Sequence, residues 1–306
     1  MKRSLFAFVI LCVGAGILAA AGCREPRMKD PAKAEPGRTL LIGLIPEQNI
    51  FRQMERYEPL AAYLSKKTGM HIKLTVLTRY GNILDNFLEV GMDGAFFGSF
   101  TYALAHARLG VEVIARPETP AGESTYHGLI FVRKDSGIAS ARQMRGKRFA
   151  LVDRATTAGY LLPLAYFKKH GVDLRTGLRE TYFSGTHEDT ILDVLNRKAD
   201  IGAAKNTVFE RLAANDMRVR RDLVVLEQSP DVPENALAVR KDLDTTVKQK
   251  LRKALLTIQN DSEGRAVLET FGARKFIPTT DSDYEPVYRY ARQIGLNLGN
   301  YNYQND

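Results

Sequence analysis

The chain has 306 residues, a length typical of about two domains, and a formal net charge of +9. Its 44% hydrophobic and 26% charged residues exclude a collagen-like or wholly disordered chain. Two cysteines exclude a disulfide-dense scaffold and a zinc site built on four thiolates. The positive charge is spread thinly along the chain, so we expect it to serve an anionic solute or a membrane surface and no nucleic acid.

The N-terminal segment has the pattern of an export signal. Lys2 and Arg3 precede an apolar run at 5–18, and the sequence AAGC follows at 20–23. This pattern resembles a lipobox and predicts a lipoprotein signal peptide at 1–22, with Cys23 lipidated as the mature N-terminus. A plain signal peptide cut nearby and an uncleaved anchor are the alternatives. The proline-containing segment 23–37 is typical of a tether, so we expect a membrane-anchored lipoprotein on the periplasmic side of the cell envelope.

From residue 39 onward, apolar runs alternate with helix patterns. The run at 39–45 reads TLLIGLI, as expected of a strand that is buried on both faces. Pro59 fits the first turn of a helix that Gly69 closes. The same analysis predicts strands at 71–77, 94–97, 111–115, 129–132, 149–152, 181–184, 201–204, 223–226 and 236–239, and helices near 83–88, 102–109, 159–170, 186–199, 209–214 and within 245–296.

This alternation predicts an α/β fold with two lobes and a mostly parallel sheet in each lobe. The sequence contains no P-loop, dinucleotide-binding fingerprint, H-E-x-x-H motif or G-x-S-x-G elbow. We therefore expect a protein that is not an enzyme, with no catalytic residues, no cofactor and no metal site. An enzyme acting on a phosphorylated substrate is the alternative that turnover assays would revive.

Hydroxyl and imidazole side chains stand at two expected helix starts. Thr156 and Thr157 follow one strand, and His187 follows the next. A helix N-terminus presents free N–H groups and a partial positive charge, which together favour an anion. Each residue alone could simply cap its helix. Because ligands of open α/β sheets lie beyond the carboxyl ends of the strands, the two starts together indicate an oxyanion site.

Five segments occur in a characteristic order, and they carry a family resemblance: 78–83 (TRYGNI), 97–102 (FGSFTY), 126–138 (YHGLIFVRKDSGI), 146–160 (GKRFALVDRATTAGY) and 184–189 (SGTHED). Through them the chain resembles the phosphonate-binding proteins of ABC transporters over most of residues 40 to 240. That family includes phosphite- and phosphate-binding relatives. The resemblance implies the type II periplasmic binding-protein fold, with a ligand cleft that closes between two lobes.

The resemblance also implies a set of ligand-binding residues. The family's phosphonate cradle falls on Thr156, Thr157 and Ala158, and its histidine falls on His187. The two pocket tyrosines fall on Tyr80 and Tyr126. Without the resemblance, both tyrosines could equally be core residues with a hydroxyl at the surface.

Two departures from the family pattern bear on the ligand. Ala158 replaces the last serine of the cradle, which removes one hydroxyl donor. Val208 follows Asn206-Thr207, where aminoalkylphosphonate binders carry an acid that meets the ligand ammonium; a second such acid is uncertain near Glu234 and Asn235. We therefore expect phosphate, phosphite or a small alkylphosphonate. Lys205, just before this motif, is interpreted as a solvated lysine at a strand end, with added positive potential at the site as the alternative.

The expected organisation is lobe one at 38–134 plus 235–306 and lobe two at 135–234. The resemblance implies that the closed form delivers its solute to an ABC permease with a cytoplasmic ATPase. A sensory binding protein that presents the same anion to a membrane histidine kinase is the alternative, and neighbouring genes would separate the two. We expect a monomer.

Overall fold

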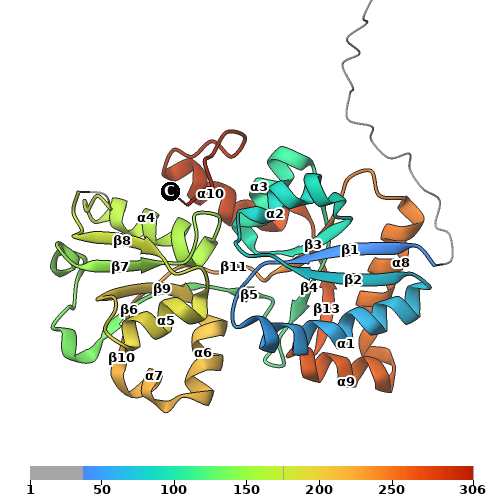
Figure 1. The fold of residues 1–306 in the computed structure, drawn as a ribbon, viewed down its shortest axis with the longest axis horizontal. Helices are drawn as coiled ribbons and strands as arrows, with labels where there is room; N and C mark the ends of the chain where they lie inside the picture. The colour runs from blue at the N-terminus through green and yellow to red at the C-terminus, as the bar shows by residue number, and fades with distance from the viewer. Residues whose placement is uncertain (1–36, 175, 306) are drawn as a thin grey trace, which may run out of the picture. The chain divides into compact units, whose positions relative to one another are not determined.

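The computed structural model describes residues 37–174 and 176–305, which contain two large β-sheets flanked by helices and one two-stranded sheet (Figure 1). The predictions for residues 1–22, for Cys23 and for the tether up to residue 36 lie outside the described residues. Within the described ranges, no helix is both long and apolar enough to cross a membrane.

Lobe one is the part of the chain built on the six-stranded sheet, whose strand order is β13-β4-β12-β3-β1-β2. Its strands are β1 (Thr39–Leu44), β2 (His71–Val76), β3 (Gly94–Phe97), β4 (Glu112–Glu118), β12 (Ala236–Val239) and β13 (Lys275–Pro278). Its helices are α1 (Ile50–Thr68), α2 (Asn82–Asn86), α3 (Ser99–Leu109), α8 (Thr245–Leu256), α9 (Ser262–Phe271) and α10 (Glu285–Gln293).

Helices cover both faces of this sheet, and β1 shows why. Leu40, Ile42 and Leu44 pack on one side in a core shared with α1, α8 and α9. Leu41 and Ile45 point to the other side, into a core shared with α2, α3 and α10. Successive side chains of a strand point to opposite faces, so a continuous apolar run is what a doubly covered strand requires.

Lobe two is built on the five-stranded sheet, whose strand order is β10-β6-β9-β7-β8. Its strands are β6 (Gly128–Arg133), β7 (Arg148–Leu151), β8 (Glu180–Phe183), β9 (Ile201–Lys205) and β10 (Leu223–Gln228). Its helices are α4 (Leu162–Lys169), α5 (His187–Leu195), α6 (Asn206–Asn215) and α7 (Met217–Asp222), and a π-helical turn, η4 (Thr157–Leu161), runs directly into α4. Helix α4 covers one face of the sheet, and α5, α6 and α7 cover the other (Figure 1).

The predicted α/β architecture is confirmed, but the sheets are mixed and not mostly parallel. In lobe one, β1 pairs in parallel with β2 and β3, whereas the pairs of β12 and β13 are antiparallel. In lobe two, β7 pairs in parallel with β8 and β9, whereas both pairs of β6 are antiparallel. The alternation rule describes strands linked by a local helix. It does not describe β6 and β12, which enter their sheets from the other lobe.

The crossing between the lobes lies earlier than predicted. Residues 128–134 were assigned to lobe one, but β6 pairs with β9 and β10 of the second sheet, so this part of the predicted boundary is wrong. The chain crosses through β5 (Thr125–Tyr126) and returns through β11 (Val232–Pro233), and these two short strands pair antiparallel. An apolar run such as 129–132 fits either sheet, because its pattern does not specify its partner.

Helix α1 begins nine residues before the proline that was expected to open it. Asn49 caps the helix, since its side chain accepts from the backbone N–H groups of Phe51 and Arg52. Pro59 lies inside the helix. Gly69 ends it as predicted, with the left-handed φ of 72° that favours glycine.

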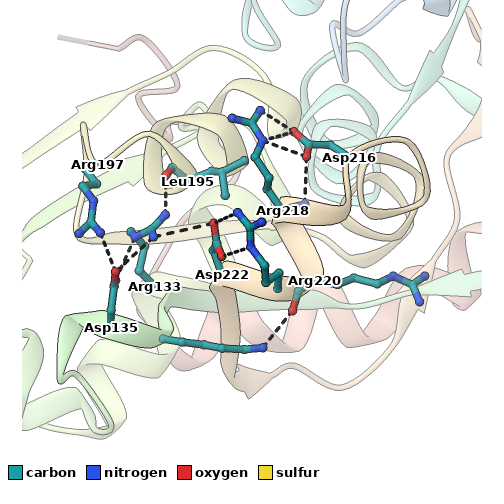
Figure 2. A network of polar contacts seen from close by, with 10 residues as sticks. Arg133, Asp135, Leu195, Arg197, Asp216, Arg218, Arg220 and Asp222 are labelled. Carbon is teal, nitrogen blue, oxygen red and sulfur yellow. Dashed lines mark hydrogen bonds and ion pairs between the residues drawn. The ribbon is translucent and has the colours of Figure 1, made fainter.

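A network of ion pairs ties α7 and the end of α5 to β6 in lobe two (Figure 2). Arg133 is its centre: the guanidinium donates to the carbonyl of Leu195 at 2.6 Å and to both carboxylate oxygens of Asp135 at 3.0 and 3.2 Å. Arg218, in contrast, is half-exposed and bonds only its near neighbour Asp216 among the interactions drawn. Exposed pairs contribute little to stability, whereas a shielded arginine that satisfies a helix-end carbonyl contributes more.

We therefore expect Arg133→Met to lower the free energy of unfolding by about 1–3 kcal/mol, because the Leu195 carbonyl and Asp135 lose a charged donor. The matched variant Arg218→Met should leave the free energy of unfolding nearly unchanged, because exposed ion pairs contribute little to stability. Urea unfolding of both variants measures the difference. Equal losses of unfolding free energy in the two variants would show that Arg133 stabilises lobe two no more than an exposed arginine does.

Candidate functional site

Five of the six predicted ligand-binding residues line one buried cavity: Tyr80, Tyr126, Thr156, Thr157 and His187. The cavity has a volume of about 10 Å³, which is room for about one water molecule. Its remaining wall consists of Ile45, Glu47, Gly98, Thr101, Lys205 and Asn235. The lining therefore comes from both lobes and from the crossing strand β5.

The cavity lies where strands end and helices begin. Gly98 is the N-cap of α3, Thr156 precedes η4, and His187 is the first residue of α5. Lys205 ends β9 and is the N-cap of α6. Because the first N–H groups of each helix lack a partner within the helix, the helix starts surround the cavity with donors and partial positive charge.

The two threonines have different roles. The Thr156 hydroxyl donates to the carbonyl of Asp153 at 2.7 Å, so its proton is already used to hold the turn after β7. The Thr157 hydroxyl oxygen accepts from the backbone N–H of Phe100 in lobe one at 2.8 Å. Thr157 therefore joins the lobes beside the cavity, and Thr156 shapes the turn that places it there.

Ala158, the sixth predicted residue, does not line this cavity. Its side chain packs toward β6, where a Cβ at Gly128 would lie 3.3 Å from the Ala158 Cβ, and it lines a separate cavity beside Leu162. The serine hydroxyl that the family pattern places at this position therefore belongs to a residue outside the cavity lining.

His187 is held as a neutral donor. Its Nδ1 accepts from the backbone N–H of Lys205 at 3.2 Å, so the proton of the neutral ring resides on Nε2. Burial lowers the pKa of His187 to about 3, with a rise from the charge of Glu47 and a further lowering from Lys205. The ring stands edge-on to Tyr80, with 5.9 Å between the centroids.

Two donors in the cavity wall have no hydrogen-bond partner among the described residues. They are the Tyr80 hydroxyl and the Asn235 amide nitrogen, both buried. The Asn235 oxygen accepts from the Lys205 ammonium at 3.2 Å, which fixes the amide orientation and leaves its NH₂ free. Burial raises the pKa of Tyr80, so its hydroxyl keeps its proton. A buried unpaired donor costs about 1–3 kcal/mol, and an acceptor atom in the cavity would recover that cost.

Lys205 is buried and paired, not solvated as the sequence analysis interpreted it. Its ammonium lies 3.1 Å from Glu47 Oε1 and also bonds Glu234 Oε1. Burial alone would lower the pKa of Lys205, but Glu234 and Glu47 hold it above its ordinary value. Burial alone would raise the pKa of Glu47, but Lys205 and other nearby cations lower it to about 2. Lys205 and Glu47 are therefore both ionised across the neutral range.

Sequence analysis missed Ile45, Glu47, Gly98 and Thr101 as cavity residues, favoured a solvated position for Lys205, and left Asn235 open. One available signal was position, because Glu47 and Lys205 lie at or just beyond strand ends, as Thr156 and His187 do. Val208, used to argue against an aminoalkyl ligand, lies in the core of lobe two with Leu212 and does not line the cavity. Val208 therefore gives no evidence about which ligand the cavity accepts.

The chain is similar to known binding proteins along most of its length. The phosphonates-binding periplasmic protein of Escherichia coli is 26% identical over 267 residues, 85% of this chain and 78% of that protein. The phosphate-import protein PhnD of Mycolicibacterium smegmatis is 25% identical over 300 residues, 90% of this chain and 91% of that protein. A binding protein component of an ABC phosphonate transporter from Pseudomonas aeruginosa has a crystal structure that matches with a TM-score of 0.77 at 25% identity, over 83% of this chain and 85% of that chain.

A family profile described as "ABC transporter, phosphonate, periplasmic substrate-binding protein" matches residues 42–284. This range runs from β1 to the segment before α10 and so takes in both sheets and the cavity between them. The chain therefore belongs to the periplasmic substrate-binding proteins of ABC phosphonate transporters.

Proposed function

We propose that this protein captures a phosphorus oxyanion (phosphate, phosphite or a small alkylphosphonate) in the cavity between its lobes and performs no catalysis. The observation that carries the proposal is the pair of buried, unpartnered donors, the Tyr80 hydroxyl and the Asn235 NH₂. The His187 Nε2–H and the N–H groups at the helix starts add to them. Charge-assisted hydrogen bonds to an ionised acceptor are about twice as strong as neutral ones, so an oxyanion is the ligand such a donor set favours.

Capture requires the lobes to move. A cavity of about 10 Å³ is smaller than a phosphorus oxyanion needs, and contacts across the lobes close it. Thr157 accepts from Phe100, and Thr101 donates to the carbonyl of Ala155 at 3.0 Å. We infer that the lobes part to admit the anion and close around it, since the donors from both lobes converge only in the closed form.

We also propose that the closed protein delivers its anion to an ABC permease with a cytoplasmic ATPase. The family description and the relatives named for phosphonate binding and phosphate import support this choice over a sensory role. The lipobox-like sequence before Cys23 supports a lipid anchor that holds the protein at the membrane on the periplasmic side.

The ligand is tested by calorimetric titration of the purified protein after bound ligand is removed by unfolding and refolding. The panel is phosphate, phosphite, methylphosphonate, 2-aminoethylphosphonate and sulfate. We expect tight binding of one of the first three. If no phosphorus compound binds, the proposed function is wrong in its substrate.

Tyr80→Phe tests the donor set directly, because it removes only the unpartnered hydroxyl. We expect the affinity for the preferred anion to fall about ten- to hundredfold, the worth of one hydrogen bond to a charged acceptor. Without ligand, the same variant should unfold at equal or higher urea concentration, because a buried unsatisfied group is gone. Tyr284→Phe, at a buried tyrosine outside the cavity, should leave the affinity unchanged. A Tyr80→Phe protein with wild-type affinity would exclude this hydroxyl from binding.

The neutral state of His187 predicts a loss of stability in mild acid. From pH 6.5 down to about 3, the unfolded chain takes up a proton at His187 that the folded chain does not. The free energy of unfolding should therefore fall as pH decreases through this window, by at most about 1.4 kcal/mol per pH unit, with no contribution from His187 above it.

Urea unfolding at about pH 7, 6 and 5 measures this slope above the range in which Glu47 contributes. His187→Gln should flatten the slope, and His71→Gln, at an exposed position, should not. A slope that persists unchanged in His187→Gln would show that another group titrates.

A further inference from the structure

The Lys205 ammonium occupies a complete ammonium-binding site beside the anion cavity. An ammonium group donates three hydrogen bonds, and here Glu47, Glu234 and Asn235 accept them. The Tyr126 ring provides a fourth contact, with its centroid 4.4 Å from Nζ. We call these four residues, Glu47, Tyr126, Glu234 and Asn235, the ammonium cage.

The cage is chemically specific. Two carboxylates, an amide oxygen and an aromatic face suit a primary ammonium, and all four side chains are buried. The position itself disfavours a cation, because Lys205 is the N-cap of α6, where the helix dipole is positive. The carboxylates of the cage therefore account for the presence of a charged lysine at this helix start.

The lysine also forms a wall between two cavities. The anion cavity and a neighbouring cavity of about 60 Å³ are both lined by Glu47, Lys205 and Asn235. The neighbouring cavity continues past Thr207 and Arg211. A substituent that left the anion cavity in this direction would pass Lys205 together with two of its hydrogen-bond acceptors, Glu47 and Asn235.

We propose that Lys205 determines the specificity of the cleft: its ammonium fills the cage from the protein side, so the cleft accepts a phosphorus oxyanion whose substituent is small and carries no cation. This inference rests on the proposed function. A ligand with an amine would find both carboxylates already bonded to the Lys205 ammonium, and it would bring a second cation close to that ammonium. A phosphite or methylphosphonate avoids both penalties.

The test compares methylphosphonate with 2-aminoethylphosphonate by calorimetric titration of the full protein. In the wild type we expect methylphosphonate to bind about ten- to hundredfold more tightly than 2-aminoethylphosphonate. In Lys205→Ala the ratio should shift by at least about tenfold in favour of 2-aminoethylphosphonate, because the ligand ammonium now meets two unpaired carboxylates in the empty cage. An unchanged ratio in Lys205→Ala overturns the proposal, as does a wild type that binds 2-aminoethylphosphonate at least as tightly.

Two controls separate specificity from a general effect of losing a lysine. Lys248→Ala removes a shielded lysine paired with Glu112 at 2.6 Å, away from the cleft, and should keep the wild-type ratio. Lys205→Ala combined with Glu234→Gln removes half of the cage charge and should abolish the gain for the amine. If the amine still gains in this double variant, the cage is not its binding site.

Chemical rescue provides a readout that does not depend on the identity of the anion. Millimolar ethylammonium should raise the unfolding temperature of Lys205→Ala and leave those of the wild type and Lys248→Ala unchanged, because only the first has an empty cage. A wild type that binds none of the phosphorus compounds rejects the proposed function, whereas absence of this rescue rejects the cage. The wild-type preference alone decides the proposal if Lys205→Ala does not fold.

Discussion

The site depends on one buried ion cluster that spans the lobes. Lys205 belongs to lobe two, whereas Glu47 follows the first strand of lobe one and Glu234 lies on the segment that returns from lobe two. Each of these charges is buried away from water, at a cost of several kcal/mol per ion, and only a nearly complete set of partners offsets that cost. The set is complete in this arrangement of the lobes because the ammonium has three acceptors. An arrangement that separated Glu47 from Lys205 would leave buried charges without their partners.

The C-terminal segment holds the turn after β7, which leads to Thr156 and Thr157. The side chain of Asn305 accepts from the Arg154 N–H at 3.1 Å and donates to Asp153 at 2.8 Å, and the Tyr301 hydroxyl donates to the Arg154 carbonyl. Asp153 in turn accepts from the backbone N–H of Ala155 and from Thr156. Residues more than 140 positions away in the sequence thus hold the turn that presents Thr157. The same segment is fixed to lobe one through Arg108, which donates to the carbonyls of Leu298 and Tyr301.

Patterns within short sequence segments were sufficient to predict the residues that lie at helix starts. Thr156, Thr157 and His187 each lie just after a strand and at a helix start, and topology brings such positions to one edge of a sheet. These rules could not predict the ion cluster around Lys205. Glu47 and Lys205 are 158 residues apart, and they pair only because the two lobes are in contact. The crossing strand β6 was misassigned for a related reason: an apolar run specifies burial but not its neighbours in the sheet. The start of α1 was missed because the Asn49 cap was overlooked in favour of a proline that the helix accommodates inside.

The proposed recognition of an oxyanion depends on which polar groups in the cavity wall still need a hydrogen-bond partner. Lys205 has all its acceptors and the Thr156 proton is used, so these groups have no strong need for a ligand. Tyr80 and Asn235 have buried donors without partners among residues 37–174 and 176–305, and His187 has a neutral N–H whose position is fixed by the backbone of Lys205. The ligand-free cavity therefore carries the cost of unpaired donors, which the proposed oxyanion would remove. The paired groups, Lys205 and Thr156, limit the size and charge of the cavity. The unpaired donors of Tyr80 and Asn235 favour a ligand that accepts hydrogen bonds. Under the proposed function, the two sets together would determine which anion binds.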